Sequence, residues 1–347
     1  MIIAFHTNQI NLLGVEVSIY DYADYCEKLL GHKAIIISSG KNRVKENASS
    51  HANQPLAIQK FKNRFPLYLY QKISDIDKIL MDQKVDLFYA QKRGDYDEIE
   101  SKNVRTVIHS VFKKNEPHGD VYAYISKWLS MEMTQGASPY VPYMINLPKV
   151  DGDLRSALAI PNDAIVMGRY GGMDSFNIDF VHDSIIKTAN DNPNFHFLLM
   201  NTRNFLNQEK KIIDKIKTRL YPRIHKQIHF LPPTASLGFK SQFINSCDAM
   251  LHARDRGETF GAAIAEFSSH NCPVITFAGN GNKDYESAHI DMLEEKCFLY
   301  NNKEDLNNIF EEFNFKLNLI KKKNWDAYSI KFSPKNVMEK FNKVFII

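Results

Sequence analysis

The sequence predicts an α/β protein whose chain forms two successive parallel-sheet domains. Short apolar runs alternate along the chain with longer stretches whose apolar residues recur at helical spacing, which is the pattern of βαβ units. A segment rich in proline and aspartate, 140–153, interrupts this pattern near the middle of the chain. At 347 residues, the chain also exceeds the length at which one hydrophobic core usually keeps growing.

The first half opens with a complete βαβ unit. The apolar run 2–7 predicts a strand, and helical spacing predicts a helix over 15–30 that Gly31 would end. A second β-branched run predicts a strand at 34–37. Because a strand–helix–strand connection crosses over, these two strands should pair in parallel. Further buried strands are expected at 85–89, 104–109 and 121–125.

The second half repeats this alternation after the segment 140–153, which we interpret as a linker. The first domain is therefore expected at 1–145 and the second at 146–325, both Rossmann-like. A C-terminal segment, 326–347, contains an amphipathic helix from 333 and is expected to pack back on the first domain. In the second domain, strands are expected at 164–167, 195–200, 228–231, 248–251, 273–277 and 297–300, with helices over 178–190, 205–220 and 260–269.

Composition narrows the functional class. A content of 44% apolar and 24% charged residues is typical of globular proteins. The net charge of +4 is too small to suggest a nucleic-acid-binding protein. The chain has no apolar run of about 18 residues, so no membrane span is expected. The start also lacks the basic leader of a signal peptide, and we expect a cytoplasmic protein with at most peripheral membrane contact.

No metal or other cofactor is expected. The four cysteines are far apart in the sequence and form no Cys-x-x-Cys pair, which predicts reduced thiols and no zinc site. Asp-x-Asp triplets occur at 75–77, 95–97 and 151–153, and we interpret them as solvated surface carboxylates.

The most informative stretch of the sequence is 247–267, which reads CDAMLHARDRGETFGAAIAEF. A buried strand leads into a polar loop and then a helix expected to begin near 259 or 260. Ligands of open α/β sheets bind at the carboxyl ends of the strands, and a helix start offers unpaired N–H groups to a pyrophosphate. Gly261 would permit close backbone approach. Glu258 and Glu266 should lie about 10–12 Å apart along the helix axis, so they would hold two separate hydroxyl-bearing groups.

This stretch resembles the Glu-x7-Glu signature of retaining GT-B glycosyltransferases, especially glycosyltransferase family 4. The order is the same: strand, polar loop, Glu, a Phe-Gly pair, a helix of small residues, a second Glu and a proline-containing strand. The resemblance implies that Glu258 contacts hydroxyls of the donor sugar and that Glu266 holds the ribose. It also implies that the amides around Thr259, Phe260 and Gly261 bind the sugar and the diphosphate.

Three further positions resemble the family. Residues 164–172, AIVMGRYGG, resemble its strand ending in Gly-Arg, which implies that Arg169 neutralises donor phosphate. Gly14 resembles the glycine of the first loop, which faces the donor. His109 matches a histidine that contacts the transferred sugar, so Glu258 and His109 are the expected catalytic residues. By residue type alone, a single histidine after a strand is more often structural.

The sequence departs from the family pattern at Asp174, where a lysine is usual about five residues after the arginine. Either another cation supplies the missing charge or the donor is bound less tightly or in a different pose. The candidate cations are Arg203, Lys240 and Arg254.

The resemblance implies a GT-B fold, with two Rossmann-like domains facing each other across a cleft. It implies retaining transfer of a hexose-type sugar from a UDP- or GDP-sugar to a glycan, lipid-linked or protein acceptor. Loops 41–62 and 113–119 would choose the acceptor. One alternative is a nucleotide-sugar epimerase or a phosphorylase of the same fold. Another is a non-catalytic module that binds a nucleotide sugar or glycan, which the aspartate at 174 favours.

Overall fold

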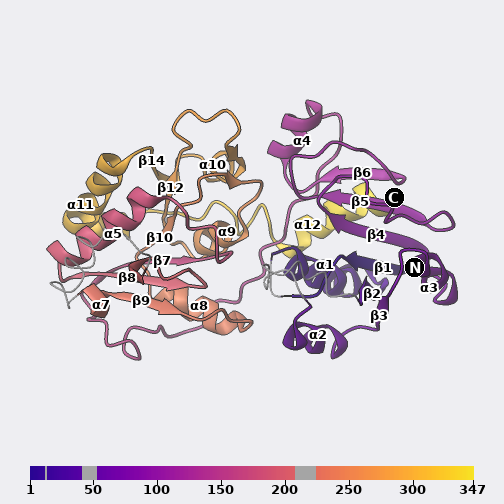
Figure 1. The fold of residues 1–347 in the computed structure, drawn as a ribbon, viewed down its shortest axis with the longest axis horizontal. Helices are drawn as coiled ribbons and strands as arrows, with labels where there is room; N and C mark the ends of the chain where they lie inside the picture. Colours follow the sequence, from indigo (N-terminus) through magenta and orange to yellow (C-terminus); the bar gives the residue numbers. More distant parts are fainter. Residues whose placement is uncertain (12–13, 41–52, 208–223) are drawn as a thin grey trace. The chain divides into compact units, whose positions relative to one another are not determined.

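The computed structural model describes residues 1–11, 14–40, 53–207 and 224–347. The chain divides into two units: Met1–Asn146 together with Ile330–Ile347, and Leu147–Ser329 (Figure 1). Each unit contains one sheet of six parallel strands. The segment interpreted as a linker spans the division between residues 146 and 147.

The sheet of the first unit has the strand order β3-β2-β1-β4-β5-β6. This is the order of a doubly wound Rossmann sheet, in which the strand sequence reverses between β1 and β4. Five strands agree with the sequence prediction to within a few residues; β3 was not predicted. The strands are β1 (Ile2–Thr7), β2 (Lys33–Ser39), β3 (Leu67–Tyr70), β4 (Leu87–Lys92), β5 (Arg105–Ser110) and β6 (Val121–Tyr124).

Helix α1 (Gly14–Leu30) and helix α12 (Pro334–Phe341) cover one face of this sheet. Apolar side chains of α1 recur at positions 19, 22, 23 and 26, which places them on one helix face in the core. From the end of the chain, α12 and the π-helical turn η3 (Asn342–Ile346) add Val337, Met338, Phe341 and Phe345 to the same core. The remaining helices are α2 (Pro55–Lys62), α3 (Asp75–Asp82) and α4 (Lys127–Thr134).

The sheet of the second unit has the order β14-β12-β10-β7-β8-β9. Counted from β7 as the first strand, this repeats the order of the first sheet, and the reversal falls between β7 and β10. All six predicted strands are confirmed to within a few residues. They are β7 (Ile165–Tyr170), β8 (Phe195–Met200), β9 (Ile228–Leu231), β10 (Ala249–His252), β12 (Val274–Phe277) and β14 (Cys297–Tyr300).

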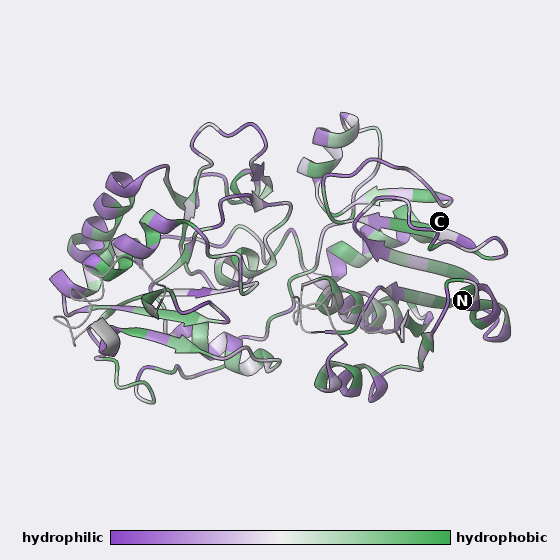
Figure 2. Ribbon diagram, in the orientation of Figure 1, coloured by the Kyte–Doolittle hydropathy of each residue, from purple (hydrophilic) through white to green (hydrophobic). Residues whose placement is uncertain are grey.

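Helices pack on both faces of the second sheet. Along β7, Ile165 and Met167 point into the core that includes α5 (Asp179–Asp191) and α11 (Lys303–Ile320). Gly168 faces the other way, where an added Cβ would lie 2.2 Å from the sulfur of Cys247. In Figure 2 the strands are largely green, whereas α11 carries purple residues on its outer side.

The shorter elements of the second unit are η2 (Phe205–Asn207), α7 (Ile224–Gln227), α8 (Leu237–Asn245), α9 (Ala262–Ser269) and α10 (Ala288–Leu293). A separate two-stranded ribbon joins β11 (Gly257–Glu258) to β13 (Glu286–Ser287). The helix predicted over 205–220 begins as the 3₁₀ turn η2, and the rest of that prediction lies outside the described residues, as does most of the loop 41–62.

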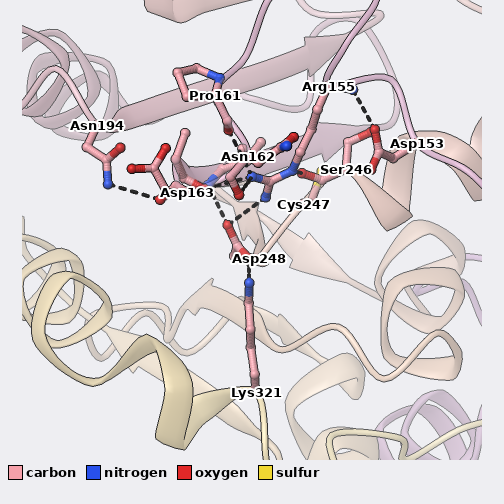
Figure 3. Close-up of polar contacts among 12 residues, drawn as sticks. Asp153, Arg155, Pro161, Asn162, Asp163, Asn194, Ser246, Cys247, Asp248 and Lys321 are labelled. Carbon is pink, nitrogen blue, oxygen red and sulfur yellow. Dashed lines mark hydrogen bonds and ion pairs between the residues drawn. The ribbon is translucent and has the colours of Figure 1, made fainter.

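A buried ion pair fixes the start of β7 and β10, at the edge of the sheet where these strands begin. Asp248 lies between Arg155 and Lys321 in Figure 3, with N–O distances of 3.0 and 2.6 Å. The same carboxylate accepts the backbone N–H of Val166 at 2.8 Å, and the guanidinium donates to the carbonyl of Ala164 at 2.8 Å. These bonds satisfy backbone groups at the start of β7.

Candidate functional site

The candidate site lies at the carboxyl ends of β7 and β10, where the strand order of the second sheet reverses. Doubly wound sheets bind their ligands at this point because the loops after the two strands diverge. After β10 the chain runs through residues 253–256 into β11 and then into α9. The stretch singled out by sequence therefore lies at the topological switch point of the second sheet.

Glu258 presents an ionised carboxylate at this edge. Its Oε2 accepts a hydrogen bond from Arg254 at 2.6 Å, and its Oε1 lies 3.6 Å from Nε2 of His252. Burial opposes ionisation, but His252 and Arg254 outweigh it and hold the pKa of Glu258 down to about 2. The side chain remains 23% exposed, so the carboxylate is charged and within reach of a ligand.

A buried polar network behind Glu258 was not predicted from sequence. Nδ1 of His252 lies 2.8 Å from the hydroxyl of Thr276, and that hydroxyl lies 3.0 Å from Nε2 of His289. Burial lowers the pKa of His289 to about 3, so this ring is neutral. The one signal in the sequence was the pair of polar residues in the otherwise apolar runs of β10 and β12.

Helix α9 begins at Ala262, later than the expected start at 259 or 260. The reason is the ribbon of β11 and β13, which keeps the backbone extended through Glu258. Gly261 then occupies the cap position with a φ of +83°, a conformation that costs other residues free energy. A Cβ at this position would lie 3.2 Å from Ile264 and 3.3 Å from His289. The turn into α9 therefore depends on glycine.

Phe260 and Thr259 precede this cap. The Phe260 side chain is buried and packs edge-on against Tyr328, with ring centroids 6.1 Å apart. Only its backbone is therefore a candidate for ligand contact, and that contact stays a prediction. Thr259 is half-buried between Glu258 and the cap.

Glu266 lies in the second turn of α9 and has partners different from those of Glu258. It accepts a hydrogen bond from the hydroxyl of Tyr170 at 2.6 Å. Lys240 lies 3.6 Å from its other oxygen and 5.3 Å from the centroid of the Tyr170 ring. Lys240, predicted as a phosphate-binding cation, is thus placed beside the carboxylate that was expected to hold the ribose.

Arg169 stabilises the loop that follows β7 through hydrogen bonds. Its guanidinium donates to the carbonyls of Asn201 and Gly172 and to the hydroxyls of Thr202 and Ser175, at 2.6–3.0 Å. The residue is 2% exposed, and burial lowers its pKa to about 10, so it stays charged near neutral pH. In this arrangement the side chain supports the loop, and direct contact with donor phosphate remains a prediction.

Asp174, found where the family has a lysine, forms an ion pair with Arg203. The two side chains come from the loops after β7 and β8, and both are about two-thirds exposed. One of the candidate cations is therefore paired with the aspartate itself, and its contact with donor phosphate stays a prediction.

His109, the other expected catalytic residue, lies in the first unit, and its contact with the transferred sugar stays a prediction. The ring is fully buried in the core of the first unit. Its Nδ1 is hydrogen-bonded to the hydroxyl of Tyr89 at 2.6 Å, and its Nε2 donates to the carbonyl of Val141 at 2.8 Å. Gly14, the other residue predicted in this unit, is exposed at the start of α1 with open space around its Cα.

Two properties of the described residues bear on other chemistries. Across these residues, no group of three or more histidine, cysteine, aspartate or glutamate side chains is arranged to hold a metal ion. In the same part of the chain, every helix is too short or too polar to cross a membrane.

Comparisons with known proteins give a clear result at the level of fold. No protein-family model matches the chain, and no curated protein matches its sequence. Among solved structures, a glycosyltransferase from Rickettsia africae ESF-5 is similar with a TM-score of 0.72 and 14% identity, over 99% of this chain and 97% of that one. Anabaena Alr3699/HepE in complex with UDP-glucose has a TM-score of 0.72 and 13% identity, over 99% and 98%.

A third similar structure is WaaG, a glycosyltransferase involved in lipopolysaccharide biosynthesis, with a TM-score of 0.65 and 11% identity over 99% of both chains. The likeness extends over both units in each case. It confirms the expected GT-B fold of two Rossmann-like domains.

Proposed function

We propose that this chain is a retaining glycosyltransferase that moves a hexose-type sugar from a nucleotide diphosphate sugar to a glycan, lipid-linked or protein acceptor. The observation that carries the proposal is the ionised, partly exposed carboxylate of Glu258 beside the start of α9, at the switch point of a GT-B sheet. Fold alone would not specify a reaction, and this site adds the chemistry.

UDP-sugars are the first donors to consider, with GDP-sugars second. Anabaena HepE is described in complex with UDP-glucose, and a Staphylococcus aureus protein of similar fold, MnaA, in complex with UDP. The MnaA likeness has a TM-score of 0.59 at 10% identity, so it supports a nucleotide site without specifying a reaction.

Each end of such a donor has a counterpart at the site. The diphosphate would lie at the amino end of α9, where Gly261 presents no side chain and the helix dipole supplies partial positive charge. The guanidinium groups of Arg203 and Arg254, each paired with a carboxylate in this structure, would also contact the diphosphate. Glu258 would accept hydrogen bonds from sugar hydroxyls, and Glu266 would use its remaining lone pairs for the ribose hydroxyls.

The reaction we propose is front-face substitution. The bond from the anomeric carbon to the β-phosphate oxygen breaks while the acceptor oxygen bonds to the same face of that carbon. The acceptor proton passes to the departing phosphate oxygen. Glu258 is held by Arg254, so its role is to orient the sugar, and the largest catalytic term would be electrostatic stabilisation of the leaving diphosphate.

The test combines binding and turnover. A calorimetric panel of UDP, GDP and their sugars should identify one base, because a bound ligand raises stability by mass action. Glu258→Ala and Arg169→Ala should each lower transfer by at least about 100-fold, the first through the sugar and the second through the loop after β7. Lys187→Ala, which changes an exposed side chain on α5, should have no effect.

The product distinguishes the alternatives. Retained anomeric configuration in a product that contains the acceptor supports the proposal. Donor altered without any acceptor indicates an epimerase, and donor binding without release of nucleoside diphosphate indicates a binding module. Near-normal transfer by purified Glu258→Ala protein would contradict the role of this carboxylate.

A further inference from the structure

Two buried ring nitrogens of the network behind Glu258 lack a hydrogen-bond partner, Nε2 of His252 and Nδ1 of His289, and the first of them faces the candidate site. His252 is 6% exposed, and its Nε2 is buried without a partner. This nitrogen lies 3.6 Å from Oε1 of Glu258, beyond hydrogen-bond distance but within the range of an ion pair. A buried polar atom without a hydrogen-bond partner costs free energy, so the position of Nε2 requires an explanation.

The ring of His252 is fixed from behind by residues of two other elements. Thr276 of β12 lies 2.8 Å from its Nδ1, and His289 of α10 lies 3.0 Å from Thr276. Tyr285 donates to the carbonyl of Phe277 and lies 3.5 Å from Nε2 of His289. His252, Thr276 and His289 are buried, and the chain of contacts leaves the imidazole of His252 one orientation, with Nε2 toward Glu258.

The protons along this chain can be assigned from the charge of Glu258. An ionised carboxylate only accepts hydrogen bonds, so the Nε2 of His252 that faces it should carry a proton. Its Nδ1 then accepts from the hydroxyl of Thr276, which is closer to this nitrogen than to the carbonyl of Phe277 at 3.4 Å. Because the Thr276 hydroxyl donates its proton to His252, its oxygen is left to accept a hydrogen bond from Nε2–H of His289. Every donor in this chain then points toward an acceptor.

We propose that His252 is a positioning residue that sets the orientation of the Glu258 carboxylate for the donor sugar. Arg254 holds Oε2, and the Nε2–H of His252 faces Oε1, so the plane of the carboxylate is determined from two sides. This inference rests on the proposed function for its substrate and on the described contacts for its geometry.

Two substitutions separate this role from a structural one. The amide of His252→Gln can place a donor where Nε2 stood, whereas the amide of His252→Asn reaches only toward Thr276. With UDP-glucose as the donor and water as the acceptor, we expect kcat for UDP release within about 3-fold of wild type for Gln. For Asn we expect a loss of about 10-fold or more in kcat, with the affinity for UDP changed less than about 2-fold in both.

If the role of His252 were purely structural, the loss in kcat would be larger for Gln than for Asn. The reason is that Asn preserves the contact that links β10 to β12. Equal losses, or a larger loss for Gln, would overturn the proposal. If wild-type protein binds none of UDP, GDP and their sugars, the proposed function fails, and a second measurement still tests the geometry. Nitrogen-15 NMR of histidine-labelled protein, assigned with the two variants, should show a proton on Nε2 of His252; a proton on Nδ1 with none on Nε2 would overturn the assignment.

Discussion

Neutral histidines buried in the core link the stability of this protein to pH. His109 is enclosed by aromatic rings, including those of Tyr22, Tyr89 and Phe345. Burial lowers its pKa to about 4, although its hydrogen bonds to backbone carbonyls favour the charged form. In the unfolded chain the same imidazole titrates near pH 6.5. The unfolded state therefore binds the proton first as the solution is acidified.

The sign of this effect follows from linkage. Between about pH 6.5 and 4 the unfolded state carries more protons, so stability falls as pH falls, by about 2 kcal/mol at pH 5 for His109 alone. We expect His109→Gln to lose that much less stability than wild type between pH 7 and pH 5. Urea unfolding followed by Trp128 in a Trp325→Phe background would measure it. An identical pH dependence in the two proteins would show that His109 is not buried and neutral.

Residue roles were less predictable from sequence than residue positions. His109 was expected at a ligand because it matches a family histidine, and strand alternation places it on the same face as Val107, which points into the core. Glu258 was identified by its motif. Its partner His252 was not, because the contact depends on how β10, β12 and α10 pack, and local sequence does not encode that packing.

Among the elements, the ribbon of β11 and β13 places Glu258, and it depends on a glycine. Gly257 has a φ of +77°, and a Cβ there would lie 2.3 Å from the carbonyl oxygen of Glu286. Gly281 has nearly the same φ, +76°, but open space around it. The two glycines therefore separate the cost of backbone conformation from the cost of a steric clash.

We expect Gly281→Ala to destabilise the second unit by about 1–2 kcal/mol, the cost of a left-handed conformation. Gly257→Ala should cost about 1–3 kcal/mol more, because the backbone of β13 must move. Denaturant unfolding followed by Trp325 measures both. Equal losses in the two variants would contradict the close approach of β11 and β13.

Buried central strands were predictable to within a few residues because apolar runs mark them. Strand β3 was missed because it lies at the edge of its sheet, where Leu69 is exposed and the four residues LYLY give no strong pattern. The start of α9 was misplaced for a different reason. The pairing of Glu258 with Ser287 joins residues far apart in sequence, and it extends the backbone where local pattern suggests a helix.

For the whole molecule, the first unit is completed by the far end of the chain. Val337, Met338, Phe341 and Phe345 are buried in its core. At about 1.5–3 kcal/mol for each large apolar side chain, their burial is comparable to the entire stability of a typical domain. The first unit should therefore not fold without the segment Ile330–Ile347.

Deletion of residues 330–347 should leave Trp128 in an unfolded environment, while Trp325 still reports a cooperative transition of the second unit. Deletion of Ile347 alone, which is 89% exposed, should change neither signal. Tryptophan fluorescence of single-tryptophan variants during urea titration would measure this. A folded first unit in the truncated chain would contradict the place given to α12 in its core.

The most direct test of the central claim, that Glu258 holds the donor sugar, is calorimetry of UDP and UDP-glucose with wild-type protein, Glu258→Gln and Glu266→Gln. We predict that Glu258→Gln weakens UDP-glucose binding by about 10-fold or more and leaves UDP unchanged, because hydrogen bonds from sugar hydroxyls to a charged acceptor are lost. Glu266→Gln should weaken both ligands. Unchanged UDP-glucose affinity in Glu258→Gln, or equal weakening of both ligands, would contradict the account.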